Sequence, residues 1–262
     1  MRDSPSWSLP GINVPLAAEQ IHVWRAYLDV PRATVARLRQ TLSPEEKARA
    51  DNYHFEIDRD RFVVARANLR NIISHYVAAN AAEIRFKYSA HGKPSIAAPP
   101  KAAQLHFNLA HSSGLALYVV TLEREIGVDL EQIHPEFAVD EIAQRFFSAN
   151  ELAEVDSLVV GERSRAFFDC WTRKEALLKA KGTGLSDRLD EIDLTPFSDE
   201  SAIILKADQD EDFCWFVRTI DVGSDFAAAV AVRGRNCNIC YWQLEENLSG
   251  QGASSILGYG VS

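Results

Sequence analysis

The chain has 262 residues, of which 47% are hydrophobic and 25% are charged. These proportions are those of an ordinary globular protein, and they exclude a fibrous or wholly disordered chain. The formal net charge of −9 argues against broad nucleic-acid binding, which needs clustered Lys and Arg. No segment resembles a signal peptide, and the longest apolar stretch, residues 115–122, is far shorter than the ~20 residues that cross a bilayer. We therefore expect a cytoplasmic protein with no membrane partner.

Charge is distributed unevenly between the two halves of the chain. Residues 1–123 carry 15 Lys and Arg against 11 Asp and Glu, whereas residues 124–262 carry 13 against 26. The balances are +4 and −13. This asymmetry indicates that the first half meets an anion and that the second half has carboxylates available for a cation.

The first half predicts a strand, a long helix and several short strands. Residues 1–20 contain three prolines and are expected to form an extended arm, and residues 21–28 (IHVWRAYL) are expected to form a strand. Residues 43–46 (SPEE) place a cap residue, a proline and a glutamate where a helix begins. The remaining predicted elements are a long amphipathic helix from residue 58 whose buried face excludes Arg59, Arg66 and Arg70, strands at 84–88, 105–109 and 115–121, and a loop around residues 91–94.

The second half repeats this plan. The predicted elements are a strand at 126–130, helices near 139–147 and 149–158, a long helix from about 162 to 181 that Gly182 stops, and strands near 203–206, 213–221, 226–232 and 238–244. Together the halves predict an α+β fold in which residues 21–123 and 124–245 form a pseudo-twofold pair, each a small mainly antiparallel sheet packed with helices. We expect residues 246–262, rich in Gly and Ser, to be a flexible tail.

Four cysteines, at positions 170, 214, 237 and 240, are too few and too scattered for a disulfide framework. The spacing of Cys237 and Cys240 is that of some metal and redox sites. The pair falls in the last predicted strand, however, without further ligands or a following helix. We therefore expect ordinary reduced thiols.

Two acidic side chains share one side of the strand at residues 127–131 (GVDLE). Successive side chains alternate along a strand, so Asp129 and Glu131 project together. Two such carboxylates repel each other unless a cation lies between them, and their hard oxygen atoms suit Mg²⁺ with a substrate phosphate. The alternative is a strand end at which both acids are hydrated.

The long helix of the second half carries a third carboxylate beside two cations. Trp171, Glu175 and Lys179 are spaced by four and share one face, which Lys174 flanks. This set suits a metal-bound pyrophosphate, with Lys174 and Lys179 as candidate ligand-binding residues. The alternative is a plain surface ion pair between Glu175 and Lys179, worth a few tenths of a kcal/mol.

Basic side chains of the first half favour a compact phosphorylated ligand over a nucleic-acid duplex, although each also fits a solvated helix surface. They are Lys47, Arg49, Arg59, Arg61, Arg66, Arg70, Lys93 and His111. The chain has no phosphate-binding loop of the GxxxxGK[ST] or GxGxxG kind. A hydrolytic serine is also disfavoured, because His111 and Ser112 would face opposite sides of a strand and no G-x-S-x-G occurs.

Several segments, taken together, resemble the 4'-phosphopantetheinyl transferases of the surfactin-synthetase-activating type. The resemblance covers about residues 21 to 245, and the pairing of the G-V-D-x-E and W-x-x-K-E-A motifs at this separation is specific. The segments are 92–94 (GKP), 107–112 (FNLAHS), 127–131 (GVDLE), 146–148 (FFS) followed by Glu151, and 171–176 (WTRKEA).

This resemblance implies a pseudo-twofold monomer that transfers 4'-phosphopantetheine from coenzyme A to a serine of a carrier protein, with Mg²⁺ and release of 3',5'-ADP. Site residues are implied as follows: Asp129, Glu131 and Glu175 hold the metal, Lys179 binds the pyrophosphate, His111 contacts the 3'-phosphate, and Gly92, Lys93 and Pro94 line the adenine side. The general base is expected to be Glu175 or, as second candidate, Glu151. The sequence departs from the family at Ala110, where a serine is common, and at Glu46, where a lysine reaches the 3'-phosphate, which leaves Arg49 and Lys47 for that contact.

Two other functions are compatible with parts of the pattern. One is a degenerate homologue that binds coenzyme A or a carrier domain without turnover, and the other is an unrelated Mg²⁺-dependent phosphodiesterase. Because the second half is itself acidic, we expect a carrier to meet a small apolar contact rather than a broad charged one. That contact is predicted in residues 137–158, with Phe147 in it and Arg145 as a local cation.

Overall fold

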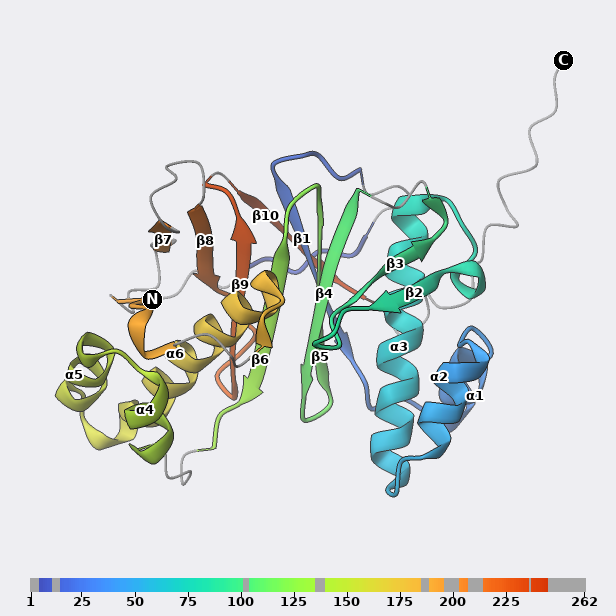
Figure 1. Cartoon of the computed structure of the whole chain (residues 1–262). Helices are drawn as coiled ribbons and strands as arrows, with labels where there is room; N and C mark the ends of the chain where they lie inside the picture. Colours follow the sequence, from blue (N-terminus) through green and yellow to red (C-terminus); the bar gives the residue numbers. More distant parts are fainter. Residues whose placement is uncertain are drawn as a thin grey trace, which may run out of the picture.

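Two four-stranded sheets form the centre of the protein (Figure 1). The computed structural model describes residues 5–10, 15–100, 104–134, 140–184, 189–195, 203–206, 214–235 and 237–244. The first sheet consists of β1 (Gln20–Tyr27), β4 (Leu105–Ser112), β5 (Leu115–Leu122) and β10 (Asn238–Gln243), in the order β10-β1-β5-β4. The second consists of β6 (Ile126–Gln132), β7 (Ile203–Lys206), β8 (Cys214–Thr219) and β9 (Phe226–Arg233), in the order β6-β9-β8-β7.

The two halves repeat one plan, as the sequence predicted. In each half a first strand pairs antiparallel with the second strand of a hairpin: β1 with β5 of the β4–β5 hairpin, and β6 with β9 of the β8–β9 hairpin. In the sequence of each half, a 22-residue helix comes after the first strand and before the hairpin. It is α3 (Glu56–Val77) in the first half and α6 (Val160–Lys181) in the second. The predicted α+β class, with two similar halves and mainly antiparallel sheets, is confirmed.

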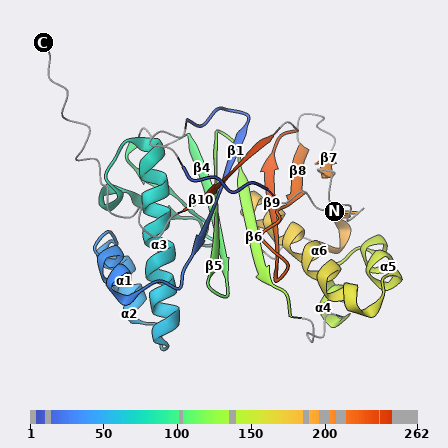
Figure 2. The ribbon, with the colours of Figure 1, turned by 180° about the vertical axis from the view of Figure 1, so that it is seen from behind.

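In the described part of the chain, four clusters of buried hydrophobic residues form the core. Three of them lie between four layers, which are α3, the first sheet, the second sheet and α6 (Figure 2). Trp24 and Leu69 belong to the cluster between the first sheet and α3. Val23 and Val230 belong to the cluster between the two sheets, and Leu177 to the cluster between α6 and the second sheet. Because β1 is covered on both faces, both sets of its alternating side chains are buried, which explains its nearly continuous apolar sequence.

Local sequence signals account for the helix ends. α2 (Pro44–Asp51) begins at the predicted capping box, in which the Glu46 N–H donates to the Ser43 hydroxyl and the Glu46 carboxylate accepts from the Ser43 N–H. α6 ends at Gly182, which has a φ of +73° and donates its N–H to the Leu178 carbonyl at 2.8 Å. The smaller helices α4 (Asp140–Phe146) and α5 (Ala149–Ser157) precede α6. In the described part of the chain, none of the helices combines the length and apolar character that a membrane span needs.

Four elements in the described part of the chain were not predicted. Helix α1 (Arg32–Arg39) and strand β3 (Pro94–Ala98) were not predicted, because α1 buries only Val35 and Leu38 and because β3 has a proline and small side chains. β3 pairs with β2 (Arg85–Tyr88) in a separate two-stranded sheet. Short 3₁₀ helices follow α3 and α6, η1 (Ala81–Glu83) and η4 (Leu189–Glu191).

The last strand corrects the predicted division of the chain. β10 was assigned to the second half, yet it pairs in parallel with β1 and so belongs to the first sheet. This pairing joins residues more than 200 positions apart, and no local pattern encodes such a partner. The described part of the N-terminal arm extends the same edge, where the Gln243 N–H donates to the Ser8 carbonyl at 2.8 Å. The predicted tail at 246–262 lies outside the described residues.

The cysteines agree with the expectation of reduced thiols. All four are free, Cys240 lies in β10, and Cys237 immediately precedes that strand. The Arg124 guanidinium donates to the Cys237 sulfur at 3.2 Å. The pair therefore belongs to a sheet edge and its adjoining turn.

Candidate functional site

The two halves meet where β4 and β6 run alongside each other. The Val128 N–H donates to Asn108 Oδ1 at 3.0 Å, and the Gln132 N–H donates to Ser112 Oγ at 3.1 Å. Asn108 and Ser112 are four residues apart on β4, and so are Val128 and Gln132 on β6. Side-chain oxygens of β4 therefore accept the backbone hydrogen bonds that a neighbouring strand's carbonyls would accept within a sheet. Ala110 lies between these two contacts, is 5% exposed and packs into the core between the sheets.

A glycine allows the acidic strand to touch the long helix. A Cβ atom at Gly127 would lie 2.2 Å from the Ala176 carbonyl oxygen and 2.3 Å from the Ala180 nitrogen, distances that no side chain tolerates. The backbone of β6 therefore packs directly on the backbone of α6. This contact brings the carboxylates of β6 close to the carboxylate and ammonium groups of α6.

An ion pair joins these two elements. Lys179 Nζ lies 2.6 Å from Asp129 Oδ1. Asp129 is only 3% exposed, and among the described residues its other oxygen, Oδ2, is buried without a hydrogen-bond donor. A buried carboxylate oxygen without a donor is costly, and in a native protein it commonly marks a position for a cation, a water molecule or a ligand.

The three acidic side chains influence one another. Burial raises the pKa of Asp129, and the Lys179 ammonium only partly opposes this. Burial and the charge of Asp129 raise the pKa of Glu131 to about 6, and the same two causes raise the pKa of Glu175. Three carboxylates thus share a region with the Lys179 ammonium.

These residues fit a hard divalent cation by their chemistry. All three offer carboxylate oxygens, the ligands that Mg²⁺ prefers, and Asp129 Oδ2 is unsatisfied. As they stand, no three metal-ligating side chains in the described part of the chain are grouped closely enough to coordinate an ion, and Lys179 occupies one oxygen of Asp129. The predicted ligands influence one another electrostatically, and their use of Mg²⁺ stays a prediction.

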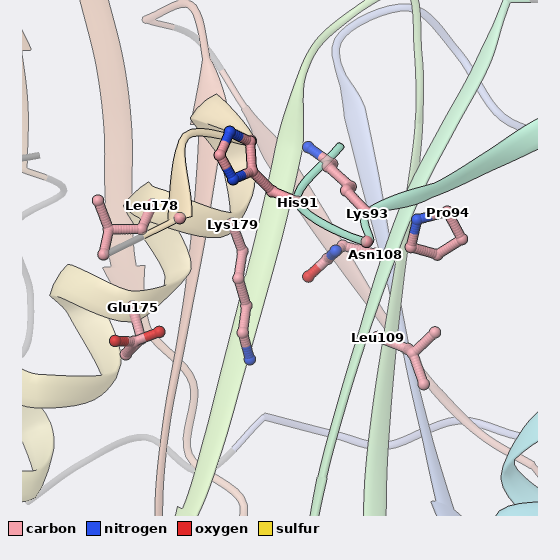
Figure 3. Close-up of a pocket in the computed structure, with 11 residues that line it drawn as sticks. His91, Lys93, Pro94, Asn108, Leu109, Glu175, Leu178 and Lys179 are labelled. Carbon is pink, nitrogen blue, oxygen red and sulfur yellow. The ribbon is translucent and has the colours of Figure 1, made fainter. Parts of the chain in front are cut away.

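A pocket of about 280 Å³ opens beside this group (Figure 3). Three segments line it: the β2–β3 turn, β4, and α6 with the residues that follow it. Five of the predicted site residues meet here, namely Gly92, Lys93, Pro94, Glu175 and Lys179. The remaining lining residues are His91, Asn108, Leu109, Leu178, Gly182 and Gly184.

His111 lies on β4 two residues beyond Leu109, so both side chains project from the same side of the strand. Desolvation of the ring and the nearby cations Lys179 and Arg61 lower the pKa of His111. Arg61 is itself held by Asp29 through two hydrogen bonds, of 2.7 and 2.8 Å. His111 therefore lies near one cation from each half of the protein, a suitable environment for an anionic group.

Two predicted site residues are directed away from this pocket. Lys174 and Glu151 form an ion pair of 2.8 Å, and both side chains are fully buried. The Lys174 ammonium also donates to the carbonyls of Leu189 and Ile192 at 2.7 and 2.6 Å. Glu151 accepts from the backbone N–H groups of Ser148 and Leu194. The expectations that Lys174 binds the ligand and that Glu151 is a general base are corrected, because the pair holds α5 and the segment around η4 against α6.

The first-half cations also divide into two groups. Glu46 is buried and pairs with Arg66 and Arg70 at 3.0 and 2.7 Å, so these two arginines lie in the interior, contrary to prediction. Arg49 is exposed, with its guanidinium 5.2 Å from the centre of the Phe62 ring. In the described part of the chain, the lining of the pocket does not include Lys47, Arg49 or His111.

The sequence reasoning missed the roles of Asn108 and Gly127. Both stand in the motifs that carried the resemblance, but their functions depend on contacts between strand and strand and between strand and helix. The one available signal was the glycine itself, since a glycine inside a strand often marks a close approach of another backbone.

Comparison with known proteins establishes the family. A profile described as the 4'-phosphopantetheinyl transferase superfamily matches residues 125–231, and one described as 4'-phosphopantetheinyl transferase, N-terminal, matches residues 30–122. The 4'-phosphopantetheinyl transferase HetI of Nostoc sp. is 34% identical over 237 residues, which cover 90% of this chain and 98% of that protein. The 4'-phosphopantetheinyl transferase Sfp of Bacillus subtilis is 28% identical over 210 residues, covering 79% and 90%. The chain belongs to the 4'-phosphopantetheinyl transferase family, and the predicted family is confirmed.

Proposed function

We propose that the protein transfers the 4'-phosphopantetheine group of coenzyme A to a serine of an acyl or peptidyl carrier protein, with Mg²⁺ as cofactor and 3',5'-ADP as the other product. The observation that carries the proposal is the pocket between the halves, in which Glu175 and Lys179 face the β2–β3 turn and Lys179 contacts Asp129. The names of the related proteins support the same reaction. Because one chain supplies all of these residues, we also propose that it acts as a monomer. A cytoplasmic location is part of the same proposal.

The reaction requires a nucleophile, a base and neutralisation of the leaving group. The serine oxygen of the carrier attacks the phosphorus that bears the pantetheine arm, and the bond from that phosphorus to the bridging oxygen breaks, so the electron pair leaves with 3',5'-ADP. Glu175 takes the proton of the serine hydroxyl. In the metal-free protein, burial and the neighbouring charge of Asp129 raise the pKa of Glu175.

Lys179 and the acidic group provide the electrostatic part of catalysis. Asp129, Glu131 and Glu175 would hold the Mg²⁺ ion, which neutralises charge on the pyrophosphate when bound. The Lys179 ammonium is fixed on Asp129 at the pocket wall, where it can hydrogen-bond an anionic group of the ligand. His111, with cations near it from both halves, is proposed to contact the 3'-phosphate together with Arg49 and Lys47.

The carrier is proposed to bind next to Glu175 on a small apolar surface. Phe146 packs edge-on against Trp171 with 5.5 Å between ring centres, and Arg145 lies 5.1 Å from the centre of the Phe146 ring. Trp171 precedes Glu175 by about one turn of α6. Phe147, which was predicted to be part of this contact, is 2% exposed and stacks on Phe167 in the interior, so Phe146 takes its place in the proposal. The start of the predicted segment, near Phe137, lies outside the described residues.

A transfer assay tests the function. The protein is incubated with coenzyme A, Mg²⁺ and a panel of apo carrier domains, and the intact mass of each carrier is measured together with the release of 3',5'-ADP. We expect a mass increase of one phosphopantetheine group, matched by an equal amount of 3',5'-ADP, on at least one carrier. Binding of coenzyme A without transfer to any carrier would instead indicate the non-catalytic homologue, and cleavage without a carrier would indicate a phosphodiesterase.

A further inference from the structure

Lys93 occupies a fixed position at the end of the β2–β3 turn. The Ser89 N–H donates to the Lys93 carbonyl at 3.0 Å, and the Lys93 N–H donates to the Ser89 hydroxyl at 3.1 Å. The Gly92 N–H donates to the Ser89 carbonyl at 2.9 Å, and Gly92 has the positive φ of +78° that this tight turn requires. The backbone of Lys93 is therefore anchored within the first half.

The side chain of Lys93 reaches into the second half. Its ammonium donates to the carbonyl of Ala180 at 2.8 Å and to the carbonyl of Ile126 at 3.1 Å. Ala180 is in the last turn of α6, and Ile126 is the first residue of β6. One side chain thus links three segments: the turn that lines the pocket, the helix that carries Glu175 and Lys179, and the strand that carries Asp129.

The contact with Ala180 suits a cation. The last four carbonyls of a helix lack partners within the helix and carry partial negative charge, so an ammonium there is favourable. Gly182 lies against the stem of the lysine, since a Cβ atom at Gly182 would be in ordinary van der Waals contact with Lys93 Cδ, at 3.6 Å. Gly184 likewise lies against His91, whose Nδ1 would be in ordinary contact, at 3.5 Å, with a Cβ atom at that position. The turn and the end of α6 are therefore fitted to each other.

We propose that Lys93 is a positioning residue whose ammonium ties the β2–β3 turn to the end of α6 and the start of β6, and thereby fixes the walls of the pocket between the halves. The family resemblance implied only that Lys93 lines the adenine side of the ligand. The geometry instead assigns its charged group to the protein carbonyls. The identity of the pocket ligand as coenzyme A rests on the proposed function. The link that Lys93 makes between the turn, α6 and β6 does not depend on that function.

The surroundings of Lys93 also give this tie a dependence on pH. Glu125, which precedes β6, favours the charged ammonium, whereas burial of the side chain disfavours it and lowers the pKa of Lys93 to about 8. From β4, His106 faces the same ammonium, and Lys93 contributes to the lowered pKa of that histidine. A neutral amine is a weaker donor than an ammonium, so the tie should weaken as the pH rises through about 8.

Hydrogen exchange tests the tie without any ligand. In Lys93→Met, we expect faster amide exchange in residues 89–94 and 178–184, with unchanged exchange in α3. Lys87→Met is the matched control, because Lys87 lies in the same hairpin on the exposed strand β2. Unchanged exchange at both segments in a folded Lys93→Met protein would overturn the proposal, whatever the ligand of the pocket is.

Calorimetric titration with coenzyme A tests the consequence for the pocket. Lys93→Met should weaken binding about tenfold or more at pH 7, since two charge-assisted hydrogen bonds are lost, and Lys87→Met should leave it unchanged. Wild-type affinity should fall between pH 7.5 and 9.5, and this fall should be absent in Lys93→Met and in Lys93→Arg, which keeps its charge. Equal affinity of Lys93→Met and wild type, or the same alkaline fall in both, would show that Lys93 does not set the pocket. Failure of the wild type to bind coenzyme A would instead overturn the proposed function, and the exchange experiment would still decide the tie.

Discussion

Asn108 and Val128 are joined across the two halves by a hydrogen bond of 3.0 Å from a backbone N–H to a side-chain oxygen. The bond fixes the register of β4 relative to β6. With this register, Leu109 of β4 lines the pocket together with Glu175 and Lys179 of α6, and His111 lies near the Lys179 ammonium. The pocket is therefore a product of how the two halves align, as well as of the residues in each.

The acidic group should be needed for activity and costly for stability. We expect Asp129→Asn and Glu175→Gln each to reduce transfer at least about 100-fold, because each removes a carboxylate proposed to hold the metal. Since burial raises the pKa of both groups, their charged forms are disfavoured in the folded state, and neither variant should unfold at a lower temperature than the wild type. Glu162→Gln, in the exposed first turn of α6, is the control. Near-normal turnover of either folded variant at saturating Mg²⁺ would contradict the metal assignment.

The proposed 3'-phosphate contacts can be tested with a truncated substrate. His111→Ala and Arg49→Ala should each lower kcat/KM with coenzyme A about tenfold or more, and they should have little effect with 3'-dephospho-coenzyme A, which lacks the proposed partner. The cycle of two enzymes and two substrates is measured under identical conditions, with the exposed Arg37→Ala as control. Equal losses on both substrates would mean that these residues act elsewhere.

Glu151 and Lys174 should matter for stability rather than for chemistry. Breaking a fully buried ion pair leaves an uncompensated charge, so Glu151→Gln or Lys174→Met should lower the free energy of unfolding by about 3 to 5 kcal/mol. The double variant should recover part of this loss, since no charge is then left unpaired. Urea unfolding measures the effect, and kcat is measured at a temperature where each variant is folded. A large loss of kcat in a stable Glu151→Gln protein would restore Glu151 as a candidate base.

His22 should make the protein sensitive to acid. The ring is 1% exposed, its Nδ1 lies 2.8 Å from the Tyr76 hydroxyl, and burial lowers the pKa of His22 to about 4. Between pH 6.5 and 4 the unfolded chain binds a proton at this site that the folded chain does not, so stability should fall as the pH falls, by up to about 1.4 kcal/mol per pH unit.

The contribution of His22 is obtained from a difference between two proteins. The pKa of Glu131 is raised to about 6, so below that pH this carboxyl group increases the stability of the folded protein as the pH falls. Both proteins contain Glu131, so its effect cancels when the unfolding free energy of His22→Asn is subtracted from that of the wild type at each pH. The difference in unfolding free energy should shrink as the pH is lowered from 6.5 to 4. A difference that does not vary with pH would rule out His22 as the sensitive group.

Binding of the carrier should depend on aromatic side chains more than on charge. Phe146→Ala and Trp171→Ala should raise the KM for a carrier domain about tenfold or more, whereas the wild-type KM should rise only modestly between about 50 and 500 mM salt, because few charge pairs form. Val160→Ala, at the exposed N-terminal end of α6, is the control for an exposed apolar side chain. A rise of a hundredfold or more with salt, or an unchanged KM in both aromatic variants, would show that the docking surface lies elsewhere.

The sequence by itself determined the family, the fold class and the elements that carry the site. Asp129 and Glu131 share a side of β6 because strand side chains alternate, and Trp171, Glu175 and Lys179 share a face of α6 because they are four residues apart. The capping box of α2 and the glycine after α6 marked two helix ends correctly, since both depend only on neighbouring residues.

The tertiary structure decided which charged groups reach the pocket. Lys174 and Lys179 lie on one helix five residues apart, and helical spacing alone cannot show that the first pairs with Glu151 in the interior and the second with Asp129 at the site. Arg66 and Arg70 were placed on the solvent side for the same reason, whereas Glu46 of another helix holds both of them inside. The pairing of β10 with β1 and the close contact of Gly127 with α6 likewise join distant segments. Such contacts depend on which faces remain to be covered once all the elements have packed, and that is a property of the whole chain rather than of any segment.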